Sequence, residues 1–485
     1  MLLAEASHLR PRRSYRRAHD NDIRRPVMSM PEPASKPGTS TANPPHGQPQ
    51  AAPSLIERLF RLREHQTDVR TEILAGVTTF LTMAYIIFVN PSILGDAGMP
   101  KDAVFVATCL AAAIGTLIMG FYANYPIAMA PGMGLNAYFA YTVVKGMGFA
   151  WEAALGAVFI SGCLFLMVTL FRVREMIVNG IPHSIRVAIT AGIGLFLAIV
   201  ALKNAGIVTA SPATLVTIGD LHQPSAVLAI IGFFVIVALD HLRVKGAILI
   251  GILLTTLLSF AFAGNTFHGV FSAPPSLSPT LFKLDISAAL SIGIINVVLV
   301  FFLVELFDAT GTLMGVANRA GLLKAGKMDR LNKALMSDST AIMAGSFLGT
   351  SSTTAYIESA SGVQAGGRTG LTAVTVAVLF LAALFIAPLA GTVPAYATAP
   401  ALLYVSCLML RELLEIDWND VTEVVPAVMT ALGMPFTYSV ANGVAFGFIS
   451  YAALKLLTGR ARSVPVMVWI IAAVFIFKFY YLPGH

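Results

Sequence analysis

The fold is decided by two segments, YPIAMAPGMGLNAYFAYTV at 125–143 and TSSTTAYIESASGVQAGG at 350–367. The first carries Pro131 and Gly132 in its first half, and the second is small and polar almost throughout. Proline removes a backbone donor and glycine favours non-helical backbone, so each segment is predicted to be a half-unwound helix. At membrane depth, such backbone is tolerated only where it lines a cavity or is buried in protein.

Both segments lie in a chain of 485 residues that is 56% hydrophobic and only 12% charged, whereas soluble domains carry about 25% charged residues. This composition excludes an ordinary soluble enzyme. Apolar runs of spanning length recur along the chain and predict an all-α integral membrane protein with about fourteen transmembrane helices. The predicted spans are 71–94, 103–121, 125–143, 150–172, 183–203, 226–241, 245–263, 287–316, 336–349, 353–365, 370–391, 395–411, 422–435 and 438–457.

The spans set the predicted domain boundaries. Residues 1–53 combine an Arg-rich run with a Pro-rich stretch and are predicted to be a disordered cytoplasmic tail. Residues 54–70 are predicted to form an amphipathic segment at the membrane interface. Two seven-helix repeats follow at 71–263 and 287–457, and then a C-terminal apolar segment at 458–485. Its apolar run is compatible with spanning the membrane, re-entering it or lying flat.

Basic residues indicate the orientation. With a cytoplasmic N-terminus, alternation of fourteen spans places the loop RAGLLKAGKMDRLNK (319–333) and most other Lys and Arg residues inside. We therefore expect a multi-pass protein of the cell (inner) membrane. The basic charge lies in the tail and in short loops rather than on a compact face, so no nucleic-acid partner is indicated.

The two broken segments are the third spans of the two seven-span halves. Interrupted spans at corresponding positions are the best sequence indication of a transporter binding site. Because seven is an odd number, the two halves must have inverted topology.

Three carboxylates lie deep in predicted spans, where an ionisable residue is a functional hypothesis by default. Glu305 and Asp308 in VELFDATGTL (304–313) are three residues apart and share one helix face. Two such carboxylates do not both ionise readily at low dielectric, so the pair is a candidate proton carrier. Glu358 precedes a half-helix whose exposed N–H groups would stabilise its charge or a polar ligand.

A small, flat, neutral molecule with in-plane N–H donors suits these carboxylates, and a nucleobase has that pattern. Asn136 is a candidate donor or acceptor, although a helix-packing role is nearly as plausible. The aromatic residues that are candidates for stacking on the base are Phe80, Tyr85, Tyr138 and Tyr356.

The three cysteines and nine histidines form no metal-ligand spacing. No metal and no cofactor are expected. A membrane-embedded enzyme would need a nucleophile and base, or metal ligands, at depth, and this pattern does not supply them.

The chain from about 55 to 482 resembles the azaguanine-type adenine/hypoxanthine/guanine permeases of the nucleobase-ascorbate transporter superfamily. The stretches that carry the resemblance are TEILAGVTTFLTMAYIIFVNP (71–91), APGMGLNAYFAY (130–141), VELFDATGTL (304–313) and STTAYIESASGVQAGGRTGL (352–371). The resemblance implies two inverted seven-helix repeats, arranged as a core domain (spans 1–4 and 8–11) and a gate domain (spans 5–7 and 12–14). It also implies proton-coupled uptake of purine nucleobases, and a homodimer as a further expectation.

The resemblance assigns the family's third-span asparagine to Asn136, its acidic pair to Glu305 and Asp308, and its tenth-span glutamate to Glu358. We expect Glu358 and Glu305 to hold the base, and Asp308 and Glu305 to handle the proton. The half-helix ends at Gly132 and Ser359 are expected to orient its polar edges. The first acidic position is more often Asp in such permeases, so the longer Glu305 leaves the preferred purine open.

Two alternatives remain open. The substrate is a different nucleobase, xanthine or uracil, or the chain is an anion exchanger of the sulfate-permease kind. An exchanger is expected to show a basic residue or bare helix termini where Glu358 stands. The sequence also leaves open sodium as the driving ion, since backbone carbonyls at a broken helix leave no sequence trace.

Overall fold

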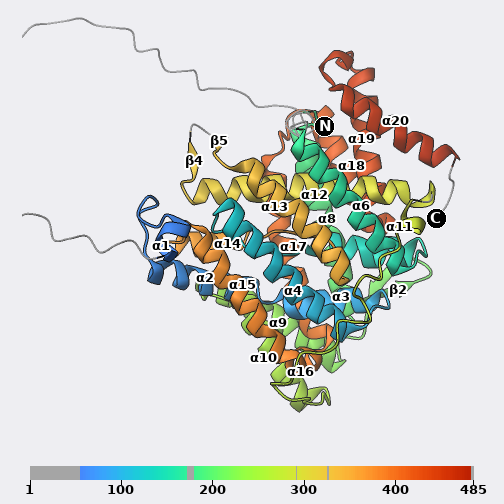
Figure 1. The fold of residues 1–485 in the computed structure, drawn as a ribbon. Helices are drawn as coiled ribbons and strands as arrows, with labels where there is room; N and C mark the ends of the chain where they lie inside the picture. The colour runs from blue at the N-terminus through green and yellow to red at the C-terminus, as the bar shows by residue number, and fades with distance from the viewer. Residues whose placement is uncertain (1–54, 172–179, 291, 325–326, 482–485) are drawn as a thin grey trace, which may run out of the picture. The chain divides into compact units, whose positions relative to one another are not determined.

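The computed structural model describes residues 55–171, 180–290, 292–324 and 327–481, which all lie in one compact unit, Pro53–His485. The predicted tail at 1–53 lies outside the described residues. The described chain is mainly helical (Figure 1).

The first half contains, in chain order, α1 (Leu55–Phe60), α2 (Val69–Met83), α3 (Ile86–Asp96), α4 (Lys101–Ile118), η1 (Met119–Ala123), β1 (Met129–Pro131), α5 (Met133–Ala137), η2 (Tyr138–Gly146), α6 (Trp151–Leu170), α8 (His183–Asn204), β2 (Val208–Ser211), β3 (Leu215–Ile218), α9 (Pro224–His241) and α10 (Ala247–Phe262).

The second half contains α11 (Ile286–Ala289), α12 (Ile292–Arg319), β4 (Leu323–Lys324), β5 (Lys327–Met328), α13 (Leu331–Leu348), β6 (Thr353–Ala355), α14 (Ser359–Gln364), α15 (Gly370–Ala383), η3 (Leu384–Ile386), α16 (Ala387–Thr392), α17 (Ala395–Leu410), η4 (Arg411–Glu415), α18 (Val421–Thr437), α19 (Val440–Leu457), η5 (Ala461–Ser463) and α20 (Val466–Tyr481).

Local sequence explains where several helices begin. The Asp68 carboxylate accepts the backbone N–H of Thr71 at 3.0 Å and caps α2. The Asp420 carboxylate does the same for Thr422 at 2.9 Å and caps α18. These side chains satisfy backbone donors that the first turn of a helix leaves unpaired.

Nine helical stretches in the described part of the chain are long and apolar enough to cross a membrane. The predicted spans that do not pass this test are the shorter α10 and α18, the more polar α13 and the two broken segments. Each still coincides with helix at its predicted place, and the all-α integral membrane fold is confirmed. The apolar run of the C-terminal segment 458–485 forms α20, which packs on α19.

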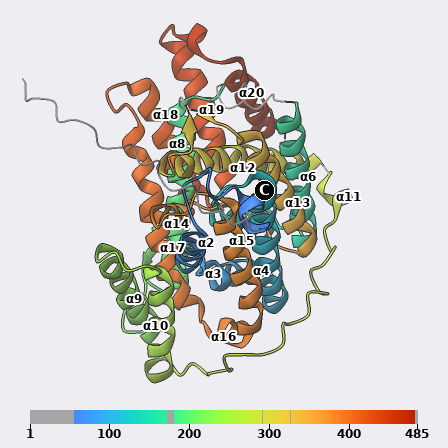
Figure 2. The same ribbon diagram turned by 60° about the vertical axis from the view of Figure 1, so that its left-hand side comes forward.

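Helix packing separates two groups. One group joins α2, α3, α4 and α6 to α12, α13, α14 and α15, and the other joins α8, α9 and α10 to α17, α18 and α19. In Figure 2 the labels of α8, α9, α10, α17 and α18 lie to the left of those of α4, α6, α13 and α15. These groups coincide with the predicted core and gate domains, and the names core and gate are used for them below.

The segment predicted to lie at the membrane interface packs against the core. The Phe60 ring lies 5.7 Å from that of Phe121, and the Asn124 amide donates to the Phe60 carbonyl at 3.1 Å. Its place at the interface stays a prediction.

Candidate functional site

The unwound halves of the two broken segments cross each other as short antiparallel strands, β1 and β6. The backbone N–H of Gly132 also donates to the Ser352 carbonyl at 2.9 Å, and that of Tyr356 to the Ala128 carbonyl at 3.0 Å. Equivalent segments of an inverted repeat are related by a two-fold axis in the membrane plane and so run antiparallel. The broken helices are confirmed, and the structure shows that each satisfies the other's backbone groups.

Buried hydroxyls fix this crossing, a name used below for residues 128–138 and 352–359 together with the acidic side chains of α12 and α13 beside them. The Thr116 hydroxyl on α4 donates to the Met129 carbonyl at 3.1 Å and accepts the Met129 N–H at 2.9 Å. The Ser359 hydroxyl accepts the backbone N–H of Ala128 at 3.0 Å. Ser359 therefore ties the start of α14 to the strand of the other repeat.

Glu358 lies directly before α14 and is half-buried. Its Oε1 accepts a hydrogen bond from the Tyr85 hydroxyl at 2.6 Å, and among the described residues no other side chain donates to this carboxylate. Tyr85 comes from the first span, which the sequence predicts as one helix; the structure divides this span at Ala84–Tyr85, between α2 and α3. That break places the phenol, only 1% exposed, against Glu358.

Asp308 is exposed although it lies within the long spanning helix α12. Its carboxylate is near enough to that of Glu358 for the two charges to repel each other, and α12 packs on α14 and β6. One turn further on, a Cβ added to Gly311 would meet nothing within 4 Å. Asp308 therefore borders open space close to Glu358.

Glu305 is fully buried on the same helix. Its Oε1 accepts the Ser161 hydroxyl of α6 at 3.1 Å, its Oε2 has no hydrogen-bond partner among the described residues, and its charge is repelled by that of Asp338. The i, i+3 spacing leaves about 60° between the Glu305 and Asp308 side chains. The predicted acidic pair therefore has two different carboxylate neighbours, Asp338 for Glu305 and Glu358 for Asp308.

Asn136 and Tyr138 follow Gly132 on the helical half of the first broken segment, and both are buried. In the described part of the chain, no residue forms a hydrogen bond with either amide atom of Asn136 or with the Tyr138 hydroxyl. Buried polar groups of this kind are typical of sites that bind water or a polar ligand. The Tyr138 ring lies edge-on to the Phe301 ring, with 4.9 Å between the ring centroids. Phe301 precedes Glu305 by one turn of α12.

The other stacking candidates have protein contacts as well. Phe80 lies edge-on to Phe380 of α15 at 5.2 Å, and the Tyr356 hydroxyl donates to the Pro131 carbonyl at 2.6 Å. Stacking of a base on any of the four aromatic residues stays a prediction.

Asp338 is the site residue that sequence reasoning missed, because its place near a span end favours a solvated or capping role. It is fully buried, and its Oδ1 accepts the Ala355 N–H at 3.0 Å and the Thr354 hydroxyl at 3.1 Å. The available signal was an ionisable residue inside the segment predicted to span at 336–349. Asp338 holds β6 in the crossing, and its charge is coupled electrostatically to that of Glu305.

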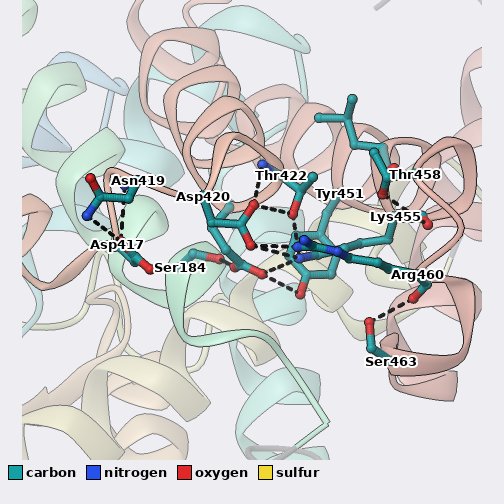
Figure 3. Close-up of polar contacts among 12 residues, drawn as sticks. Ser184, Asp417, Asn419, Asp420, Thr422, Tyr451, Lys455, Thr458, Arg460 and Ser463 are labelled. Carbon is teal, nitrogen blue, oxygen red and sulfur yellow. Dashed lines mark hydrogen bonds and ion pairs between the residues drawn. The ribbon is translucent and has the colours of Figure 1, made fainter.

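The gate contains a partly buried carboxylate in a very different environment, and its partners Ser184, Tyr451 and Lys455 are labelled in Figure 3. Glu423 of α18 pairs with the Lys455 ammonium of α19 at 2.6 Å, where the lysine side chain is only 5% exposed. The carboxylate also accepts the hydroxyls of Tyr451, at 3.0 Å, and Ser184. Lys455 in turn donates to the Thr422 hydroxyl at 2.6 Å. These five residues are called the gate cluster below.

The gate cluster and the crossing differ in whether their carboxylates are paired with cations. Across the described ranges, Glu305, Asp308 and Glu358 take part in no ion pair. No group of three or more His, Cys, Asp or Glu residues in the same ranges is arranged to hold a metal ion. The crossing thus presents carboxylate oxygens and amide atoms that a neutral hydrogen-bonding molecule or a proton can satisfy.

Comparison with known proteins adds a family. Residues 70–446 match the permease family of the xanthine/uracil type. The chain is 50% identical over 441 residues to the adenine permease AdeP of Escherichia coli (strain K12), covering 91% of this chain and 99% of that one. It is 49% identical to the adenine permease AdeQ of the same strain, covering 87% and 96%. It is 44% identical to the guanine/hypoxanthine permease PbuO of Bacillus subtilis (strain 168), covering 87% and 100%.

Solved structures show the same fold at low sequence identity. The transmembrane domain of the cyanobacterial bicarbonate transporter BicA aligns with a TM-score of 0.61 at 16% identity, covering 78% of this chain and 97% of that one. SLC26A9 aligns with a TM-score of 0.58 at 13% identity, covering 86% and 73%. These likenesses confirm the inverted-repeat architecture and concern the fold alone.

Proposed function

Because this chain belongs to the permease family, we propose that it imports purine nucleobases across the cell membrane by proton symport, with its N-terminus in the cytoplasm. The observation that carries the proposal is the crossing, where Tyr85 is the only described side chain that donates to the Glu358 carboxylate and Asp308 lies accessible beside it. A neutral base with in-plane N–H groups fits such an acceptor better than an anion does.

The relatives narrow the substrate class. AdeP, AdeQ and PbuO are named for adenine or for guanine and hypoxanthine, and the adenine permeases are the more similar, at 49–50% against 44% identity. We therefore propose adenine, guanine or hypoxanthine rather than xanthine, uracil or an inorganic anion, with adenine as the first substrate to test.

The roles follow from the environment of each group. Glu358 and Glu305 accept N–H groups of the base, and Asn136 supplies a donor or an acceptor to its other edge. Asp308 and Glu305 exchange the coupled proton, because a carboxylate without a cation nearby is more easily neutralised than a paired one. The backbone ends at Gly132 and Ser359 orient the polar edges of the base, and the homodimer stays a prediction.

Uptake in cells that lack their own purine permeases tests the proposal. Radiolabelled adenine and hypoxanthine would be supplied with unlabelled guanine, xanthine, uracil or sulfate as competitors, with and without a protonophore. We expect saturable uptake that purines inhibit and that the protonophore abolishes. Uptake that survives the protonophore but needs sodium would overturn proton coupling, and inhibition by sulfate but not by purines would overturn the substrate class.

A further inference from the structure

The Tyr85–Glu358 hydrogen bond joins residues that lie 273 positions apart in the chain. At 2.6 Å it is short, as expected for a hydroxyl that donates to a carboxylate. The tyrosine is 1% exposed, so its hydroxyl is not itself presented to a ligand. The contact therefore occupies one acceptor site of Oε1 and makes that oxygen a weaker acceptor for a ligand.

Neighbouring contacts hold both partners of this hydrogen bond in place. The Thr82 and Ser361 hydroxyls bond to each other at 2.9 Å and tie α2 to α14. At the break in the first span, the Ile87 N–H donates to the Ala84 carbonyl at 3.1 Å, which tightens the turn that carries Tyr85. Tyr85 and Glu358 thus lie in one packed unit.

The number of free oxygens matters for purine choice. A carboxylate with both oxygens free can accept two parallel N–H groups side by side. Guanine offers such a pair on one edge, its ring N1–H and its exocyclic amino group, whereas hypoxanthine has the same ring without that amino group. A carboxylate with one oxygen already engaged by a phenol accepts the second of these donors only weakly, because that oxygen shares its charge with the hydroxyl.

We propose that Tyr85 is a specificity-determining positioning residue, which engages Oε1 of Glu358 and thereby weakens a second hydrogen bond from guanine to that carboxylate. The inference rests on the proposed function, since it assumes that Glu358 binds the purine. It gives the first span a part in selecting the substrate through a hydroxyl that never touches the base.

Substitution of Tyr85 by Phe tests this, because it removes the hydroxyl and keeps the ring. Inhibition constants of guanine and hypoxanthine against adenine uptake would be measured for the unmodified chain and for Tyr85→Phe. We expect the ratio to shift about tenfold in favour of guanine, as for one added charge-assisted hydrogen bond. A role in packing alone would weaken both bases equally, so an unchanged ratio would overturn the proposal.

Tyr451→Phe is the matched control, because Tyr451 also donates to a glutamate, at 3.0 Å, but in the gate cluster. We expect it to leave the ratio unchanged, and a similar shift there would contradict the assignment to Tyr85. The unmodified chain gives a second test that needs no variant: guanine should compete no more than about threefold better than hypoxanthine. A tenfold guanine advantage without any substitution would overturn the inference, whereas absence of any purine uptake would overturn the proposed function itself.

Discussion

The gate cluster and the crossing bury carboxylates in opposite ways. In the gate, Glu423 has the Lys455 ammonium at 2.6 Å and two hydroxyl donors. In the core, Glu305 has one hydroxyl donor and an oxygen to which no described residue donates, and Glu358 has a single phenol. Both regions remove charge from water, but only the gate supplies the opposite charge.

This difference in charge pairing distinguishes a carboxylate that stabilises the fold from one that can bind a ligand or a proton. A buried carboxylate with its own cation is satisfied in every state of the protein and has little to gain from a ligand. A buried carboxylate without a cation is costly unless a proton or a hydrogen-bonding ligand neutralises it. The crossing is therefore where binding or protonation is expected to release the most free energy, and the gate cluster is an internally paired contact between α18 and α19.

The largest effect is expected in the gate. Lys455→Met leaves the Glu423 charge without its cation and should lower the free energy of unfolding by about 3 kcal/mol, the low end of the range for buried pairs, because Glu423 is 22% exposed. Thermal denaturation of the detergent-purified protein measures this. The double variant with Glu423→Gln should recover much of the loss, and a double variant as unstable as the single one would show that the pairing is not the cause.

The next effect is expected at the crossing, on transport rather than on folding. Glu358→Gln keeps the shape of the side chain but replaces an acceptor oxygen by a donor, which should cost about 2 kcal/mol of binding. That corresponds to a roughly 30-fold weaker apparent affinity in the uptake assay.

The comparison variant is Asp220→Asn, which alters a carboxylate in an exposed loop and should transport normally. Full-affinity uptake by Glu358→Gln, with protein shown to be in the membrane, would remove Glu358 from the site.

The third prediction concerns Asp338, a carboxylate of the crossing whose substitution is expected to affect the stability of the fold. Asp338→Ala leaves the buried N–H of Ala355 without its acceptor and should destabilise the protein by roughly 1–2 kcal/mol. Asp338→Asn keeps a carbonyl oxygen for the same two donors and should fold nearly as well. Equal losses of melting temperature in the two variants would mean that the charge, rather than the hydrogen bonds to β6, is what the fold requires.

The smallest effect concerns pH and the edge of the gate cluster. Hydrogen bonds from the Thr422 hydroxyl and backbone N–H lower the pKa of Asp420 below its usual range, with a further contribution from Lys455 and Arg460. A carboxyl with a lower pKa in the folded state stabilises the fold above its unfolded pKa of about 4. That stabilisation is lost as the pH falls through the folded pKa.

Melting temperatures recorded from pH 6 to pH 3 should therefore decline in acid, and Asp420→Asn should flatten that part of the decline. A variant whose acid profile is identical to that of the unmodified protein would assign the decline to other carboxylates.

Much of the architecture followed from local patterns. Apolar runs placed the spans, since hydrophobic length is a local property. Pro131, Gly132 and the small residues around Glu358 marked the broken helices, because proline and glycine act on the backbone where they stand. The deep carboxylates Glu305, Asp308 and Glu358 were also visible, because charge is rare in apolar runs.

Other features depended on which distant segments meet. Nothing local in TTA at 353–355 predicted a strand paired with residues 129–131, and Asp338 was missed because its partners lie 16 and 17 positions away. The break that brings Tyr85 to Glu358 was likewise absent from the predicted span.

The sequence by itself determined that this chain spans the membrane many times, that two corresponding spans are interrupted and that carboxylates stand beside the interruptions. Only the tertiary structure decided the partner of each carboxylate. Lys455 neutralises Glu423, the charge of Asp338 is coupled to that of Glu305, and Glu358 is left with one oxygen engaged by Tyr85. The physical reason is that hydrophobicity and backbone preference belong to single residues, whereas the satisfaction of a buried charge depends on groups that folding brings together.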